Sequence, residues 1–155
     1  MATITSLDLQ SVVILTDTYD SPPIVVYDSL IRAASPYMNR LVSNEPHDGE
    51  VRRVELQYDG LLQTDDIGIY VRWLYGVKLK DIFPVSYEEQ VGDYARLYLS
   101  ACELGDKRFT SAVMDRLITA IEEATLLSKT SDSAVRDVVK VLYQVLGNGE
   151  GGDTG

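Results

Sequence analysis

The strongest constraint on the fold of this chain is a pair of apolar helical segments that a glycine separates, between Leu97 and Asp115. The two segments read Leu97-Tyr98-x-x-Ala101-x-x-Leu104-Gly105 and Phe109-x-x-x-Val113-Met114-Asp115. Apolar residues spaced three and four apart share one face of a helix. Glycine after such a run is a common helix end, because it readily adopts the left-handed conformation. The pattern therefore predicts two amphipathic helices with a break at Gly105.

Upstream, the chain predicts a small sheet followed by further helices. β-branched and alternating runs predict strands at 12–15, 24–27 and 51–58, with the first two paired across a turn at 19–23. Apolar periodicity predicts helices at 28–34, from 36, from 64 to 75, from 86 to 105, from 109 to 121 and from about 132 to 146. The expected fold class is α+β, a small sheet of short strands flanked by a cluster of five or six helices.

Local signals mark where several of these helices begin and end. Asp28 is predicted to cap the first short helix. Ser35 followed by Pro36 predicts the start of the next, since serine can cap and proline at the first helical position loses no needed N–H. Asp66, with its neighbours 64–65, is predicted to open a helix at the positive end of its dipole. Gly76 is predicted to end that helix.

One predicted stripe bears on chemistry. Val91, Ala95, Tyr98 and Cys102 are spaced as one face of a helix. This interpretation makes Cys102, the single cysteine, a small core residue rather than a nucleophile. We accordingly expect slow labelling of its thiol in the native protein.

Composition and charge exclude several classes of function. The chain has 155 residues, 14 basic and 24 acidic, for a net charge of −10, which suits one domain with a tail. Nucleic-acid binding needs clustered basic residues, and the densest spots here are mere pairs, such as Arg52-Arg53. No run approaches the roughly 20 apolar residues of a membrane span, and residues 1–5 lack a basic, apolar leader pattern. We expect an intracellular protein, in nucleus or cytoplasm, without direct nucleic-acid or membrane binding.

No catalytic constellation stands out in the sequence. His47 is the only histidine and falls in a polar loop, and one histidine plus one cysteine cannot form the usual zinc site. The sequence Gly147-x-Gly149-x-x-Gly152 resembles a dinucleotide fingerprint, but it follows a predicted helix instead of a strand. We therefore predict no enzymatic activity, no metal and no cofactor. A small enzyme with an unrecognised site remains the distant alternative.

Several pieces of the sequence, in order, resemble a BTB/POZ domain over about residues 11–120. Ile31-x-x-x-Ser35-Pro36-Tyr37-Met38 resembles its Leu-x-x-x-Ser-x-x-Phe element, Val12-Val13-Ile14 its first strand, Tyr70-x-x-Trp73-Leu74-Tyr75-Gly76 its Tyr-Thr-Gly helix end, and Leu97 to Asp115 its last helix pair. The whole is similar to stand-alone BTB proteins of filamentous fungi. The resemblance implies a BTB/POZ-like domain at 11–127, between an N-terminal arm at 1–10 and a helical extension at 128–146, with a disordered Gly-rich tail at 147–155.

The chain also departs from that family. The family's charged pocket uses an Asp before the first strand and a His-Lys or His-Arg pair after the second, whereas this chain has Ser11, Tyr27 and Asp28 there. Swapped BTB dimers use an N-terminal helix and strand, and the ten residues before Ser11 are too few for both. We expect a monomer or a weak dimer.

The resemblance implies a non-catalytic protein–protein interaction module. Its predicted docking residues lie around the helix end at Tyr75 and in the following loop, namely Tyr75, Asp81, Phe83 and Tyr87. The implied role is an adaptor or oligomerisation module, with cullin-3, as part of a ubiquitin ligase, or a second copy of the chain as the expected partner. A transcription-regulatory oligomerisation domain is the alternative.

Overall fold

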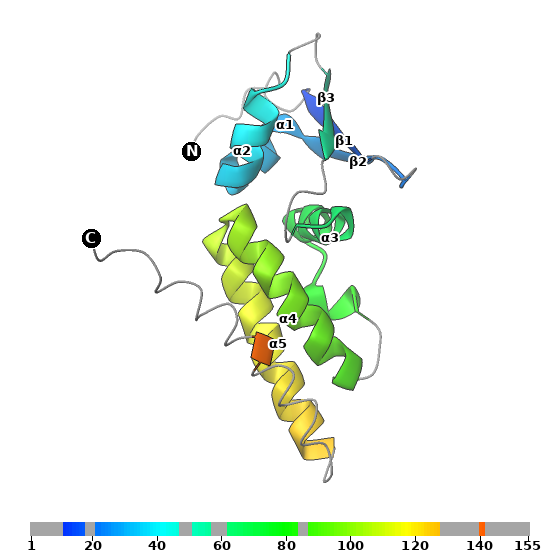
Figure 1. The fold of residues 1–155 in the computed structure, drawn as a ribbon, viewed down its shortest axis with the longest axis vertical. Helices are drawn as coiled ribbons and strands as arrows, with labels where there is room; N and C mark the ends of the chain where they lie inside the picture. The colour runs from blue at the N-terminus through cyan, green and yellow to red at the C-terminus, as the bar shows by residue number, and fades with distance from the viewer. Residues whose placement is uncertain are drawn as a thin grey trace, which may run out of the picture.

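The computed structural model describes residues 11–17, 21–46, 51–56, 62–83, 87–127 and 140–141. The architecture is α+β, as expected from the sequence: a small sheet with α1 and α2 lies at one end, and the hairpin of α4 and α5 extends to the other, with α3 between them (Figure 1). No helix within the described ranges is long and apolar enough to cross a membrane.

The sheet contains β1 (Val12–Asp17), β2 (Ile24–Tyr27) and β3 (Val51–Leu56) in the order β2-β1-β3. β1 pairs antiparallel with β2, which confirms the predicted hairpin, and parallel with β3. The inner face buries alternate residues of all three strands: Val13, Leu15, Val26, Val54 and Leu56. The predicted third strand was longer, and its last two positions, 57–58, lie outside the described residues.

Helix α1 (Asp28–Ala34) follows β2 directly, and its start corrects one prediction. Asp28 is the first helical residue rather than the cap, and the capping position, Tyr27, makes no side-chain capping bond. The Asp28 carboxylate is buried and contacts Arg52 Nε on β3 at 3.2 Å and Arg32 Nη1 at 3.5 Å. These cations neutralise the carboxylate, and the longer-range pairing with Arg52 could not be seen in the local sequence.

Helix α2 (Pro36–Ser43) begins as predicted. The Ser35 hydroxyl accepts a hydrogen bond from the Met38 N–H at 3.1 Å, and Pro36 occupies the first turn. The same hydroxyl donates to the carbonyl of Leu104 at 2.6 Å. One buried serine thus caps α2 and ties it to the end of α4.

Helix α3 (Thr64–Leu74) also begins where the sequence indicates, but Asp66 has an additional role. Its side chain is buried, and it accepts a 2.6 Å hydrogen bond from the Ser100 hydroxyl on α4. Asp66 therefore links the start of α3 to the middle of α4.

The two helices predicted around Gly105 are α4 (Tyr87–Leu104) and α5 (Lys107–Leu127), which pack against each other as a hairpin (Figure 1). Gly105 has a positive φ of 75°, a conformation that glycine adopts without strain. An added Cβ there would also lie 3.4 Å from Pro36 Cδ. This distance is an ordinary van der Waals contact, so it is the backbone conformation of the turn that favours glycine.

The predicted stripe on α4 is wrong at its end. Val91 and Ala95 are buried and Tyr98 is half-buried, but Cys102 is exposed. The buried face instead follows Tyr94, Leu97, Ala101 and Leu104. Both sets have helical spacing, so periodicity alone allowed the wrong phase; packing against α5 and α2 decides which one is buried.

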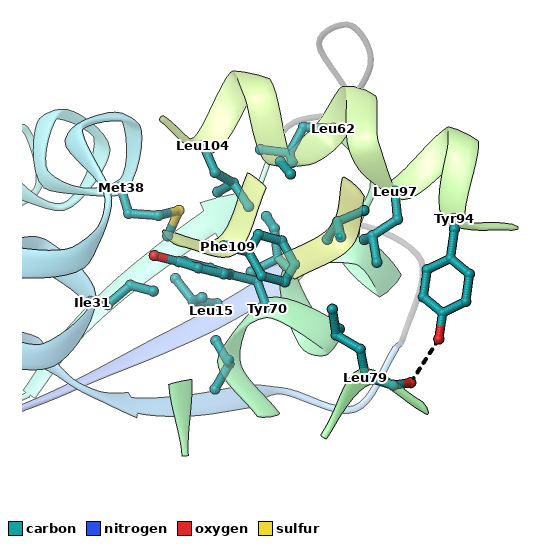
Figure 2. Close-up of a cluster of buried hydrophobic side chains, with 14 of the residues drawn as sticks. Leu15, Ile31, Met38, Leu62, Tyr70, Leu79, Tyr94, Leu97, Leu104 and Phe109 are labelled. Atoms are coloured by element: carbon teal, nitrogen blue, oxygen red, sulfur yellow. Dashed lines mark hydrogen bonds between the residues drawn. The ribbon is translucent and has the colours of Figure 1, made fainter. Parts of the chain in front are cut away.

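The core joins the sheet to the helical hairpin through aromatic side chains (Figure 2). Tyr70 of α3 contacts Phe109 of α5, with ring centroids 4.8 Å apart. Trp73 stacks beside Tyr70 and also meets Phe109 at 5.0 Å, so the end of α3 packs against α5. Tyr94 of α4 donates to the Leu79 carbonyl at 3.0 Å (Figure 2).

The C-terminal predictions fall largely outside the described residues. Of the extension predicted at 128–146, the structure describes only Lys140 and Val141, which are helical. Val141 packs against the core cluster. The arm at 1–10 and the tail at 147–155 lie outside the described ranges.

Candidate interaction surface

The surface begins at the C-terminal end of α3, where Tyr75 is half exposed, with 49% of its area accessible. Gly76 ends the helix with a φ of 90°, and its N–H bonds back to the Trp73 carbonyl. The Val77 N–H bonds to the Arg72 carbonyl in the same turn. This glycine termination fixes the position at which the Tyr75 side chain leaves the helix.

The Tyr75 side chain reaches β2, which is remote in sequence. Its hydroxyl accepts a hydrogen bond from the Tyr27 backbone N–H at 3.1 Å. The two rings lie with centroids 6.2 Å apart at an interplanar angle of 53°. Aromatic pairs favour such tilted arrangements. The contact joins the end of α3 to the end of β2 and leaves both rings on the surface.

The outer face of the sheet continues this surface. By the strand register, Val12, Ile14, Val25, Tyr27 and Val51 share the face opposite the core. None of these apolar residues is fully buried, and Val25 is 54% exposed. We call these five residues the outer sheet face. Of the five, Val25 and Tyr27 are exposed and the other three are partly buried, and the exposed Arg53 lies opposite Ile14 on the same face. Exposed apolar residues bordered by polar ones are found at interaction sites.

The other predicted docking residues are placed differently from Tyr75. Asp81 is exposed in the short 3-10 helix η1 (Leu79–Asp81), which the buried Leu79 anchors. Phe83 is half-buried, and its ring meets Tyr94 edge-on at 5.0 Å. Tyr87 is the first residue of α4, and its side chain lies outside the described residues. Phe83 thus packs toward the helical core, while Tyr75 and Asp81 stay accessible.

Of the residues on this surface, Tyr75 was among the predicted docking residues and Val25 was not. Tyr27 and Tyr75 both fall at element ends, where an amphipathic ring often anchors a partner. Val25 sits in a uniformly apolar run, which predicts a strand but does not show which of its side chains is exposed. Within the described residues, β2 is an edge strand and Val25 is 54% exposed.

The basic pair at Arg52-Arg53 is not available as a unit. Arg52 contacts Asp28, and its Nη1 donates to the Val42 carbonyl at 3.0 Å. Arg32 is held in the same network, donating to Asn39 and Ser43. These bonds join α1, α2 and β3, so the cations stabilise the packing of the sheet end.

Two tyrosines have shifted acidity. Burial, and then the hydrogen bond from its hydroxyl to Asp106 at 2.9 Å, raise the pKa of Tyr70 far above its usual value of 10. Burial, and then the neighbouring Cys102 side chain, raise the pKa of Tyr98. Both shifts favour the neutral phenol. Among the described residues, no group of three or more His, Cys, Asp or Glu side chains could hold a metal ion.

Comparisons with known proteins gave no match: no family model, no curated protein and no solved structure corresponds to this chain. The candidate surface is therefore supported by the contacts and exposure of its residues alone.

Proposed function

We propose that this chain is a non-catalytic protein-interaction module of the BTB/POZ kind, and that a partner docks on Tyr75, Tyr27 and the outer sheet face. The observation that carries the proposal is the continuity of exposed apolar groups from Val25 through Tyr27 to Tyr75. Tyrosine is enriched among the residues that contribute most to binding, because it combines a large ring with a hydroxyl. The hydrogen bond between Tyr75 and β2 holds this anchor in place before a partner arrives.

Two roles follow for such a module. The first is an adaptor that joins a substrate to a cullin-3 ubiquitin ligase, with the end of α3 near the docking face. The second is an oligomerisation domain in transcriptional regulation, in which the partner is another copy of the chain. The net charge of −10 opposes self-association at low salt and favours the adaptor role.

The test compares two equivalent changes at exposed apolar positions. Val25→Arg places a cation on the proposed surface, and Leu126→Arg places one at an 82% exposed position on α5. β2, which contains Val25, and the C-terminal end of α5, which contains Leu126, lie toward opposite ends of the molecule (Figure 1). Partner proteins are captured from cells with the wild-type chain, identified and purified. Calorimetry then measures the affinity of each partner for the wild type and for each variant.

We expect Val25→Arg and Tyr75→Ala to weaken binding at least about tenfold, and Leu126→Arg to leave it unchanged. The purified N-terminal region of cullin-3, tested in the same way, separates the adaptor role from oligomerisation. Equal affinities for wild type and both surface variants would show that partners dock elsewhere.

A further inference from the structure

The hydrogen-bond pattern of β2 shows which of its backbone groups face away from the sheet. The Asp28 N–H donates to the Ser11 carbonyl at 2.9 Å. Hydrogen-bonded and non-bonded pairs alternate along an antiparallel ladder. Ser11 and Asp28 thus form a bonded pair, and the next bonded pairs are Val13 with Val26 and Leu15 with Ile24. The N–H and C=O groups of Val25 and Tyr27 consequently point away from β1.

An independent contact confirms this direction. The Tyr27 N–H donates to the Tyr75 hydroxyl, which does not belong to the sheet. Within the described part of the chain, the backbone of Val25 has no hydrogen bond on this outer side. Val25 therefore presents one donor and one acceptor at the open edge of the sheet, beside the Tyr27 carbonyl.

The two edges of the sheet are protected differently. β3, at one edge, carries Arg52, Arg53 and Glu55, and charges are a usual protection against pairing with other strands. β2, at the other edge, reads Ile24-Val25-Val26-Tyr27 and has no charged residue or proline within it. Such an uncharged edge can accept an additional strand from another protein.

The charges beside this edge indicate what the added strand carries. Residues 67–80 contain three basic residues and no acidic one, although the whole chain has 24 acidic residues against 14 basic ones. The three are Arg72, Lys78 and Lys80, and all are exposed. Arg72 lies three residues before Tyr75, one turn earlier on α3, and Lys78 follows Tyr75 by three residues in the chain, beyond the helix end at Gly76. The stretch is bounded by the buried Asp66 and the exposed Asp81. Its three exposed cations can attract a negatively charged segment.

We propose that the free edge of β2 accepts an extended segment of a partner protein as a fourth strand, and that acidic residues flanking this segment meet Arg72 and Lys78. Backbone bonds to Val25 supply the pairing, and the exposed Val25 and Tyr27 side chains contact alternate side chains of the segment. The inference rests on the proposed function and names the chemistry of its partner.

The test uses defined peptides and amide NMR, which also detects weak binding. The probe has the sequence Glu-Glu-Val-Thr-Val-Thr-Val-Glu-Glu, and a matched peptide has lysine in place of every glutamate. We expect saturable shifts of the Val25 and Tyr27 amides with the acidic probe, and at least about tenfold weaker binding of the lysine peptide. A probe N-methylated at alternate residues, which lacks backbone donors on one edge, should bind as weakly as the lysine peptide.

Variants of the protein separate pairing from packing. Val25→Pro removes the outward N–H together with the β-branched side chain, at a position where edge strands tolerate proline, and should abolish probe binding. Val25→Thr keeps the N–H and the β-branched shape and should retain it. The double variant Arg72→Glu and Lys78→Glu should weaken binding of the acidic probe at least about tenfold. Arg40→Glu, on the exposed surface of α2, should leave that binding unchanged.

Each contrary result has a definite meaning. If the acidic and lysine peptides bind equally, or N-methylation has no effect, strand addition with acidic flanks is wrong. Without peptide, the Val25 and Tyr27 amides could shift with protein concentration while light scattering shows a dimer. The edge of β2 would then bind a second copy of the chain, and the proposal would be overturned. The acidic probe could fail to bind while Val25→Arg still abolishes binding of the captured partner. That result would reject strand addition at β2 but would agree with the proposed docking surface. Probe binding with unaffected capture of the partner would instead reject the proposed function.

Discussion

The Tyr70 hydroxyl donates a 2.9 Å hydrogen bond to Asp106, and this bond joins α3 to the turn between α4 and α5. The other oxygen of the same carboxylate accepts the N–H groups of Arg108 and Phe109 at 3.0 and 3.4 Å and so caps α5. Both Tyr70 and Asp106 are buried. A single carboxylate thus fixes the start of α5 and its contact with α3.

Removing the hydroxyl should destabilise the protein measurably. In Tyr70→Phe, a buried carboxylate oxygen loses its partner, which costs about 1–3 kcal/mol. Tyr94→Phe is the matched variant, because Tyr94 is equally buried but donates to a neutral carbonyl. Its cost should be smaller, about 0.5–1.5 kcal/mol. Urea unfolding measures both; a larger loss for Tyr94→Phe would contradict the importance assigned to Asp106.

The same tyrosine predicts the response to alkaline pH. The pKa of Tyr70 is raised in the folded state above its usual value of 10, so near and above pH 10 the unfolded chain releases this proton first. The stabilisation is fully present below pH 10 and falls by about 1.4 kcal/mol per pH unit above it. The free energy of unfolding, measured from pH 8 to 11, should decline less steeply for Tyr70→Phe than for the wild type. Parallel declines would indicate that Tyr70 ionises normally.

A third prediction concerns Leu74. The sequence favours a core position for it, with a loss of roughly 2–5 kcal/mol on truncation to alanine if fully buried. The structure shows Leu74 only half-buried at the end of α3, whereas Leu97 is completely buried. We therefore expect Leu74→Ala to cost about half as much as Leu97→Ala, the latter about 2–5 kcal/mol. Thermal melts of both variants decide this; equal losses would place Leu74 in the core.

The exposure of Cys102 reverses the expectation from the sequence. Because the thiol is accessible on α4, Ellman's reagent should modify it in the native protein at a rate similar to that in denaturant. Such labelling reflects accessibility and does not indicate a nucleophilic site. Val113→Cys, buried in α5, in a chain with Cys102→Ser provides the protected control. Slow native labelling of Cys102 would contradict its exposed position on α4.

The charge predicts the assembly state. With a net charge of −10, copies of the chain repel one another at low salt, and added salt screens this repulsion. We expect a monomer by light scattering at low micromolar concentration and low ionic strength, with any self-association increasing as salt is added. A stable dimer at low salt would contradict the prediction, and deletion of residues 1–10 would show whether that arm forms it.

Much of the local structure could be predicted from the sequence, because its determinants are short-range. The Ser35-Pro36 start of α2 and the glycine ends at Gly76 and Gly105 each depend on the conformational preference of one or two residues. The β1–β2 hairpin follows from two β-branched runs separated by a turn. The tyrosine at the end of α3 was a candidate docking residue through the resemblance to the BTB/POZ family.

The features that only the tertiary structure decided depend on residues remote in the chain. Periodicity could not choose between Ala101 and Cys102 as the buried residue of α4, since the two differ by a small rotation about the helix axis that packing against α5 fixes. Asp28 was predicted to cap a helix because the local sequence does not show its ion-pair partner, Arg52, which lies on β3. The exposure of Val25 was not predicted, because the sequence does not show that β2 is an edge strand of the sheet. The sequence by itself therefore determined the order of the strands and helices and several of their ends, because these depend on short-range preferences, whereas the tertiary structure decided which of their faces are buried.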